Sequence, residues 1–357
     1  MGSYDHEQPE PQNLWIETPC IPSVPLSRAA GCNIFLKLEN LQPSGSFKSR
    51  GIGHMMQQSM LGKRTSDVHF YCSSGGNAGL ACATAAKILS RPCTIVVPTL
   101  TKQHMIDKMR LLGAKVHQVG SHWALADAHL RSELLAHDPA GVYVPPFDHP
   151  DIWKGASTMV DELVYQVKPH NVSQIDGIIC NCGGGGLLNG IMTGIENNFP
   201  SPSLPHQKSK PKVLAVETIG ADSLNASVRA GELVTLPAIT SIATSLGAPR
   251  VSEESFRWSQ EASYLTSLTV SDAEAVAATS RFADDARMLV EVACGATIAP
   301  VYNGDLRRLL GGESLSNEEW REKNVVVIVC GGSNVSLEAL RVWEEQYGVR
   351  EMDMYKI

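Results

Sequence analysis

The chain has 357 residues, with 30 Lys and Arg against 37 Asp and Glu, which gives a formal net charge of −7. This length predicts two packed domains, and the acidic balance without any basic cluster argues against nucleic acid or an acidic membrane surface as a partner. A small molecule is the expected partner.

The first residues and the cysteines predict a cytoplasmic protein. Residues 1–6 contain no basic segment followed by an apolar one, so we expect no secretory signal. The longest apolar runs, such as Val325–Cys330, are too short to cross a bilayer. The nine cysteines are scattered without a C-x-x-C pair, and we expect them to be reduced and mostly buried.

Strands and helices alternate in the first half of the chain. The predicted strands are Val68–Cys72, Cys93–Val97, Lys115–Val119 and Val142–Val144. The predicted helices are Ala78–Leu89 and Lys102–Leu112. Such alternation is typical of a parallel sheet with helices on both faces.

The same alternation continues in the second half. Strands are predicted at Asp176–Asn181, Val213–Glu217 and Val325–Cys330, each before a glycine-containing turn and a helix, whereas Ser201–Pro211 is expected to be an exposed loop. We therefore predict an α/β fold of two domains, each a mostly parallel twisted sheet with helices on both faces. The large domain is expected to comprise residues 1–40 and 148–357, and the small domain residues 41–147. In such folds, ligands bind at the carboxyl ends of the strands.

The first candidate for chemistry is Lys48, in the sequence SGSFKSRG at 44–51. A lysine among small residues and beside Phe47 is partly desolvated, which favours the neutral amine that a Schiff-base nucleophile requires. A solvated lysine near the start of a helix is the competing interpretation, and this motif alone does not decide between them.

The second candidate is the turn Ser73-Ser74-Gly75-Gly76-Asn77, directly after a predicted strand and before a helix. Its backbone N–H groups converge at a helix N-terminus, where a substrate carboxylate would be stabilised. A plain tight turn capped by Asn77 is the alternative.

The third candidate is a run of four glycines, Gly183–Gly186, between the strand Asp176–Asn181 and a helix predicted at Leu187–Glu196. Four glycines allow the backbone to wrap closely around a phosphate, and they cost conformational entropy that a mere turn does not require. The run matches neither the P-loop nor the dinucleotide-binding pattern.

The fourth candidate is Cys330, at the end of a predicted strand in the sequence CGGSN. Its position would allow contact with a ligand, although a buried structural cysteine is the commoner case.

Together and in this order, these features resemble the fold-type II pyridoxal 5′-phosphate (PLP) enzymes, the tryptophan-synthase-β-like family, from about Thr18 to Leu337. Within that family, the chain is similar to the liver-type catabolic L-serine/L-threonine dehydratases. The stretches that carry this similarity are FLKLE at 35–39, QPSGSFKSRGIG at 42–53, VPPFDHP at 144–150, VET at 216–218 and VIVCGGSNVS at 327–336.

The resemblance implies that PLP binds in the cleft between the two domains, with Lys48 as its Schiff-base lysine. It assigns Phe47 to the cofactor ring, Asn77 to the ring's 3′ oxygen, and Cys330 to the pyridine nitrogen. The phosphate would bind at Gly183, Gly184, Gly185, Gly186 and Leu187. The substrate carboxylate would bind at Ser73, Ser74, Gly75, Gly76 and Asn77.

The resemblance also implies the reaction. L-Serine would give pyruvate and ammonia, and L-threonine 2-oxobutanoate, by α,β-elimination with Lys48 as general base and the cofactor phosphate as proton donor to the leaving hydroxyl. The expected protein is a cytoplasmic homodimer that acts on an amino-acid substrate in catabolism and gluconeogenesis.

Several alternatives within the fold fit less well. Serine racemase needs a second base, a serine directly after the first loop serine, and here Gly75 follows Ser74. Cysteine synthase and cystathionine β-synthase carry Thr or Ser among the loop glycines. Biosynthetic threonine deaminase has a C-terminal regulatory domain, and this chain ends soon after the Cys330 motif. A catalytically silent PLP-fold binding protein is the alternative from another class, and the retained Lys48 argues against it.

The resemblance implies one metal site, for a monovalent cation such as potassium. Its ligands would be Glu217 and backbone carbonyls of Ala221, Ser223, Leu246 and Ala248, which suits the preference of hard cations for oxygen. The alternative is that Glu217 caps the next helix.

Overall fold

A computed structural model describes residues 13–61, 68–199, 209–312 and 315–349. Residues 1–6, and most of the loop expected at 201–211, lie outside these ranges. Within them, no helix has both the length and the apolar character that crossing a membrane requires. All nine cysteines fall inside the described ranges, and each is buried with a free thiol.

The larger sheet has six strands in the spatial order β1-β2-β10-β7-β8-β9. Neighbouring strands are parallel except β1 and β2, which pair antiparallel with Cys20 opposite Lys37. Its strands come from both ends of the chain: β1 (Cys20–Pro22), β2 (Asn33–Lys37), β7 (Gly177–Asn181), β8 (Lys212–Thr218), β9 (Leu265–Val270) and β10 (Asn324–Ile328).

The smaller sheet has four strands in the order β5-β4-β3-β6, all parallel. In its register, Tyr71 of β3 lies opposite Tyr143 of β6. The strands are β3 (His69–Cys72), β4 (Cys93–Val97), β5 (Lys115–Gln118) and β6 (Gly141–Tyr143).

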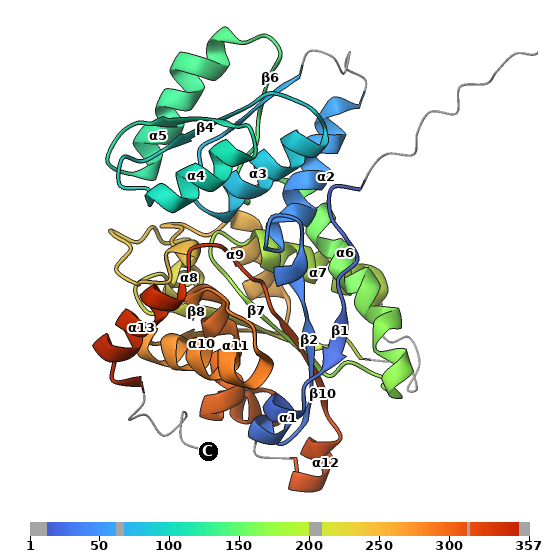
Figure 1. The fold of residues 1–357 in the computed structure, drawn as a ribbon. Helices are drawn as coiled ribbons and strands as arrows, with labels where there is room; N and C mark the ends of the chain where they lie inside the picture. Colours follow the sequence, from blue (N-terminus) through green and yellow to red (C-terminus); the bar gives the residue numbers. More distant parts are fainter. Residues whose placement is uncertain (1–12, 62–67, 200–208, 313–314, 350–357) are drawn as a thin grey trace, which may run out of the picture.

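The helices cover both sheets, and Figure 1 shows the smaller sheet with its helices above the larger one. The first six are α1 (Val24–Ala30), α2 (Lys48–Met60), α3 (Asn77–Ile88), α4 (Gln103–Leu111), α5 (Trp123–His129) and α6 (Pro150–Gln166). The others are α7 (Gly186–Asn198), α8 (Ser223–Ala230), α9 (Glu253–Glu261), α10 (Asp272–Ala286), α11 (Val292–Asn303), α12 (Asn317–Arg321) and α13 (Leu337–Gln346).

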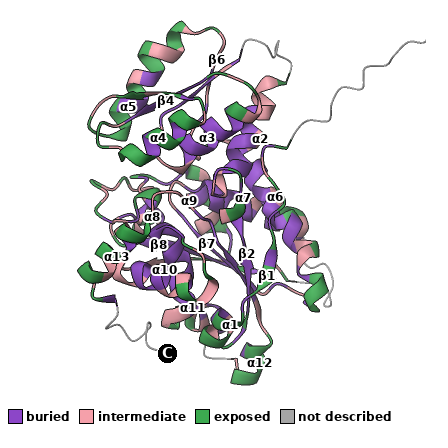
Figure 2. Cartoon of the chain, viewed as in Figure 1, coloured by how far each residue is buried: buried purple, intermediate pink, exposed green. Residues whose placement is uncertain are grey.

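The predicted fold class is confirmed: two mostly parallel sheets have helices packed against them. The central strands β4 and β7 are buried along their whole length, because helices shield them from water on either face (Figure 2). The smaller sheet uses residues 69–143, and the larger sheet uses residues 20–37 and 177–328. Domain boundaries at 40/41 and 147/148 stay a prediction.

Helices α2 and α6 pack backbone against backbone. A Cβ added at Gly51 would lie 2.7 Å from the carbonyl oxygen of Ile152, and one added at Gly155 would lie 2.5 Å from that of Arg50. Only glycine permits this approach. The position of α2, and of Lys48 at its start, is therefore determined by α6.

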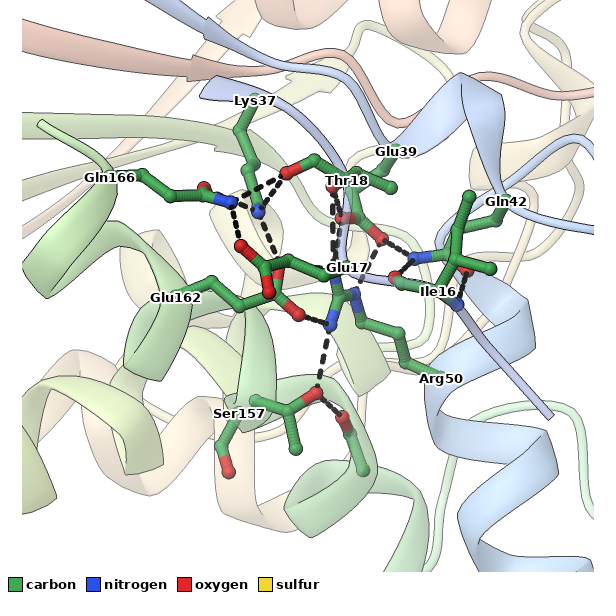
Figure 3. A network of polar contacts seen from close by, with 12 residues as sticks. Ile16, Glu17, Thr18, Lys37, Glu39, Gln42, Arg50, Ser157, Glu162 and Gln166 are labelled. Carbon is green, nitrogen blue, oxygen red and sulfur yellow. Dashed lines mark hydrogen bonds and ion pairs between the residues drawn. The ribbon is translucent and has the colours of Figure 1, made fainter. Parts of the chain in front are cut away.

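A buried ion cluster fixes the same helix (Figure 3). Arg50 of α2 donates to both oxygens of Glu39, at 2.7 and 2.8 Å, and to both oxygens of Glu162 on α6, at 2.5 and 2.7 Å. Lys37 of β2 also pairs with Glu162 and donates to the Thr18 carbonyl at 2.7 Å. The side chains of Arg50, Lys37 and Glu39 have no exposed surface. Two positive and two negative groups thus satisfy one another away from water.

The first prediction concerns this cluster. Replacing Arg50 with Met is expected to lower the free energy of unfolding by about 3–5 kcal/mol, because Glu39 and Glu162 would keep buried charges without a counter-ion. Urea unfolding followed by circular dichroism measures the change.

The matched control is Arg257→Met on the surface helix α9. Arg257 pairs with Glu254 and Glu261, but its side chain is 43% exposed. We expect a loss of at most about 1 kcal/mol there. Equal losses of unfolding free energy in the two variants would show that the buried cluster contributes no more to stability than a surface ion pair.

Candidate active site

Lys48 is the first residue of α2, and its side chain reaches the loop that follows β6. Its Nζ donates to the carbonyl oxygen of Pro146 at 2.5 Å and lies 5.3 Å from the centre of the Phe47 ring. Both contacts belong to motifs that the sequence had marked, SGSFKSRG and VPPFDHP. The lysine therefore lies where a loop of the smaller sheet meets the start of α2.

Burial lowers the pKa of Lys48 to about 8. Loss of hydration of the ammonium is the main cause, and the nearby Cys72 opposes it. The side chain as a whole is half-buried, but Nζ lies deep enough for this effect. A substantial share of neutral amine is then present near neutral pH, as a nucleophile or base requires.

The Cys330 turn is attached to the Lys48 loop through the backbone. Phe47 N–H donates to the Cys330 carbonyl at 3.2 Å, and Gly332 N–H donates to the Gly45 carbonyl at 2.9 Å. A Cβ on Gly331 would lie 2.4 Å from the Gly45 carbonyl oxygen, so this approach also requires glycine. Two motifs nearly 300 residues apart in the chain are thus held in contact.

The Cys330 thiol is buried and neutral. It is 4% exposed, and Asn181 Nδ2 donates to its sulfur at 3.0 Å. Its pKa is well above the ordinary thiol value, chiefly through a hydrogen bond with Cys294 and then through burial. A thiolate is therefore excluded at this position near neutral pH.

The turn at 73–77 connects β3 to α3, as predicted. Gly76 N–H donates to Ser74 Oγ at 3.3 Å, which closes the turn, and Asn77 begins the helix. The Ser73 hydroxyl is directed elsewhere and donates to Asp127 at 2.6 Å. Its side chain is therefore engaged by the protein, and the turn offers mainly backbone N–H groups at a helix N-terminus.

Glu291, a buried carboxylate that the sequence analysis did not identify, lies among these turns. It is 4% exposed and accepts from Asn77 Nδ2 at 2.9 Å, Ser245 Oγ at 2.5 Å and Asn334 N–H at 2.7 Å. Because a carboxylate only accepts, it orients the Asn77 amide, whose Oδ1 accepts from Ser333 N–H at 3.0 Å. The available signal was an acidic residue directly before the apolar helix α11.

The four-glycine run forms the turn into α7. Gly185 has φ 100°, in the left-handed region that favours glycine. A Cβ on Gly184 would lie 2.4 Å from the Phe147 ring, and one on Gly183 would lie 3.1 Å from Leu246 Cα. The first N–H groups of α7 have no acceptor within the helix. The turn is thus tightly packed against Phe147 and Leu246, and it leads into a helix N-terminus that favours an anion.

A second layer of hydroxyl groups supports this turn, and the sequence analysis missed it. Ser252 N–H donates to the Gly184 carbonyl at 3.1 Å. Its hydroxyl accepts from Asn189 Nδ2 at 3.0 Å, and Ser255 Oγ donates to Asn189 Oδ1 at 2.7 Å. All three side chains are at most 4% exposed. The glycine turn is therefore held in one shape by a buried polar cluster.

Glu217, proposed as a cation ligand, caps α8 in this structure. Its two oxygens accept from Leu224 N–H at 2.9 Å and Asn225 N–H at 2.7 Å, and burial raises its pKa to about 8. Nearby, the Ser223 hydroxyl is buried without a hydrogen-bond partner. Across the described ranges, no three His, Cys, Asp or Glu side chains gather as metal ligands. A cation here would depend on Glu217 and on the carbonyls of Ala221, Ser223, Leu246 and Ala248.

Residues 12–331 match the family model described as "Pyridoxal-phosphate dependent enzyme". This chain belongs to that family. An L-serine dehydratase of Saccharomyces cerevisiae (strain AWRI1631) is 40% identical over 90% of this chain and 94% of the yeast protein. The L-serine dehydratase/L-threonine deaminase of Bos taurus is 43% identical over 94% and 97%. The crystal structure of a fungal L-serine ammonia-lyase from Rhizomucor miehei is similar with a TM-score of 0.83 and 38% identity, over 94% of this chain and 100% of that one.

The residues present fit the cofactor of this PLP-dependent family. The glycine turn at 183–186 presents backbone N–H groups at a helix N-terminus, where anions bind, and neighbouring protein atoms leave no room there for a side chain. Lys48 provides an amine with a lowered pKa, and Cys330 a neutral group beside the same loop. The predictions of fold family and cofactor are thus confirmed, while the individual residue roles stay predictions.

The second prediction follows from the pKa of Lys48. With a pKa of about 8, roughly 10% of the amine is neutral at pH 7, against less than about 0.1% for an ordinary lysine. In cofactor-free protein, attachment of pyridoxal phosphate to Lys48 is expected to accelerate with pH and to level off above pH 8–9. Borohydride trapping and mass spectrometry of the peptide that contains residue 48 measure the rate.

The control is Lys48→Ala, in which labelling at other lysines should show no such plateau. A rate at Lys48 that still climbs tenfold per pH unit up to pH 10 would contradict the lowered pKa.

Proposed function

We propose that this protein is an L-serine dehydratase (ammonia-lyase) that forms pyruvate and ammonia, and that it also converts L-threonine to 2-oxobutanoate. The observation that carries the proposal is the Lys48 amine, with its pKa lowered to about 8, beside the loops of both sheets. Relatives of about 40% identity over 90% or more of the chain, named for this activity, support the choice of substrate.

Lys48 is proposed to remove the α-proton. When bound, pyridoxal phosphate supplies the electron sink that makes this proton removable. Lys48 would then act as a neutral base, held at close range by the start of α2. The Pro146 carbonyl, which already accepts from Nζ at 2.5 Å, can hold the amine in place.

The turn at 73–77 is proposed to bind the substrate carboxylate. Its backbone N–H groups lie at the N-terminus of α3, where the helix dipole favours a negative charge. Gly75 and Gly76 allow the backbone to approach the carboxylate closely. This turn would orient the α-carbon toward Lys48.

Cys330 is proposed to face the pyridine nitrogen as a neutral group. A carboxylate there would hold a proton on the ring and stabilise negative charge at the α-carbon for long periods. The thiol, whose pKa is far above neutral, does neither. This environment favours prompt loss of the β-hydroxyl over side reactions.

Serine racemase is the alternative within the fold, and the surroundings of residue 75 disfavour it. A Cβ added at Gly75 would lie 2.7 Å from both Cγ2 and Oγ1 of Thr101. The space that a second base would need is thus filled by Thr101. The lowered pKa of the Lys48 amine also disfavours a catalytically silent binding protein, because binding alone does not require a neutral amine.

The proposal includes finer features for which the support is resemblance. We infer a homodimer in the cytoplasm that serves amino-acid catabolism and gluconeogenesis, with the large and small domains divided at residues 40/41 and 147/148. We also propose, on the same resemblance, a potassium ion at Glu217.

The third prediction tests the activity itself. The purified protein with bound PLP is expected to release pyruvate from L-serine and 2-oxobutanoate from L-threonine, and Lys48→Ala should lower both rates by at least about 10³-fold, because it removes the proposed base. A coupled dehydrogenase assay measures both products. The same assay, run in potassium chloride and then in tetramethylammonium chloride, tests whether activity depends on a bound potassium ion. Wild-type protein without either product, or near-normal activity of Lys48→Ala, would refute the proposal.

The fourth prediction concerns Gly75. Wild-type protein should form almost no D-serine. Gly75→Ser alone is expected to lower pyruvate formation about tenfold or more, because its Cβ collides with Thr101 and shifts the carboxylate turn. Adding Thr101→Gly should restore much of the rate. Chiral chromatography of the remaining serine measures D-serine, which we expect to appear only in the double variant.

Thr101→Gly alone is the control and should retain most of the pyruvate rate. If Gly75→Ser alone were as active as wild type, Thr101 would not limit residue 75.

A further inference from the structure

Two hydroxyl groups at the carboxyl ends of neighbouring strands of the smaller sheet donate to one carboxylate oxygen. Ser73 Oγ and Tyr143 OH each donate to Asp127 Oδ1 at 2.6 Å, and the two hydroxyls are 3.5 Å apart. Ser73 is fully buried, and Asp127 is 9% exposed. Apart from the assignment of Ser73 to the carboxylate turn, no role proposed above uses this cluster.

The two donors stand at the start of the two loops of the smaller sheet that form the site. Strands β3 and β6 are parallel neighbours, so their carboxyl ends lie together, where ligands bind in such sheets. Ser73 begins the proposed carboxylate turn. Tyr143 ends β6 and leads, through Val144, to Pro146, whose carbonyl accepts from Lys48. One carboxylate therefore joins the loop proposed for the substrate to the loop that contacts the proposed base.

Asp127 is itself held firmly. It belongs to α5, and Arg131, one turn later, donates to its other oxygen at 2.8 Å. The Arg131 guanidinium lies 3.8 Å from the centre of the Tyr143 ring. Burial alone would raise the pKa of Asp127, but the hydrogen bonds from Ser73, Tyr143 and Arg131 outweigh it, and the pKa is lowered. The carboxylate therefore stays charged near neutral pH.

Helix α5 also packs firmly on the sheet. Ala126 and Leu130 are completely buried in a small apolar cluster with Val96 of β4 and Tyr71 of β3. Asp127 is thus attached to a rigid element, and it can transmit that rigidity to the two loops.

We propose that Asp127 is a positioning residue that holds the substrate-carboxylate turn and the Lys48-facing loop in one fixed relation. This inference rests on the proposed function. Asp127 does not touch the substrate; it acts through Ser73 and Tyr143. The backbone N–H groups at 74–77 are then presented to the carboxylate without an ordering cost at each binding event.

The smaller sheet contains a matched control. Asp138 accepts from the hydroxyl of Tyr71 at 2.8 Å, and Tyr71 lies opposite Tyr143 in the register of β3 and β6. The pair Asp138–Tyr71 thus repeats the carboxylate–tyrosine bond of Asp127–Tyr143 on the adjacent strand. Asp138 makes no contact with Ser73 among the described interactions.

The experiment compares Asp127→Asn, Ser73→Ala and their double variant with Asp138→Asn, all with bound PLP. Asp127→Asn is expected to raise KM for L-serine about tenfold while kcat stays within about threefold, because the loss of a hydrogen bond to a charged group misplaces the turn and leaves Lys48 in place. Ser73→Ala should give a similar rise, and the double variant no more than either. Asp138→Asn should leave KM unchanged.

Hydrogen exchange gives a readout that does not depend on turnover. Peptides covering 73–79 and 143–148 should exchange faster in Asp127→Asn than in wild type, and not in Asp138→Asn. If Asp127→Asn does not fold, Tyr143→Phe removes one of the same bonds with little change in packing and takes its place.

The outcomes separate the two proposals. Absence of turnover in the wild-type protein would refute the dehydratase function. Faster hydrogen exchange of both loops in Asp127→Asn would, even then, support the role of Asp127 in holding the two loops together. Full activity of wild type together with unchanged KM and unchanged exchange in Asp127→Asn would overturn the inference alone. Additive rises of KM in the double variant would also overturn it, since the two residues would then act separately.

Discussion

The buried salt bridges between Arg50, Glu39, Glu162 and Lys37 are the interaction on which the rest of the structure depends. They join α2 to β2 and α6, and α2 carries Lys48 two residues before Arg50. A buried ion cluster gives little net stability compared with an apolar core, but losing one member is costly, so it strongly favours a single arrangement. The close approach of α2 and α6 at Gly51 and Gly155 acts in the same direction. Lys48 is the first residue of α2, so several independent contacts fix the position of its backbone.

Around that fixed point, both sheets contribute turns at the carboxyl ends of their strands. The smaller sheet provides the turns after β3 and β6, and the larger sheet those after β7 and β10. Asn77, in the turn after β3, joins them, because its Nδ2 donates to Glu291 and its Oδ1 accepts from Ser333 N–H in the turn after β10. Burial lowers the pKa of the Lys48 amine, whereas a hydrogen bond with Cys294 and then burial raise the pKa of the Cys330 thiol. Both groups can therefore be neutral near pH 7.

Sequence reasoning recovered what local signals encode. Strands β4, β7 and β10 and helices α3 and α7 were predicted within two residues at each end, because apolar runs and glycines act over short distances along the chain. Strand β1 was missed because it has only three residues, and β9 because it is only partly buried. Strand β2 was also missed, although four of its five residues are buried. Asp127 and Glu291 were also missed. Their partners Ser73 and Asn77 are 54 and 214 residues away, and no spacing rule reaches that far. The Arg50 cluster was invisible for the same reason, although Arg50 lay inside a motif that was recognised.

The four glycines at 183–186 show why composition alone misleads about rigidity. A glycine run is usually flexible, yet here each missing side chain gives room to a neighbour: the Phe147 ring at Gly184, Leu246 at Gly183, and Ser255 at Gly185, where an added Cβ would lie 2.0 Å from Oγ. The turn is enclosed by these contacts and by the bond from Ser252 to the Gly184 carbonyl. A serine in place of Gly185 would collide with Ser255 of α9, so the packing of this turn requires glycine there. Packing of these neighbouring side chains against the turn offsets the conformational entropy that the glycines lose on folding. The same contacts hold the all-glycine loop in one defined conformation.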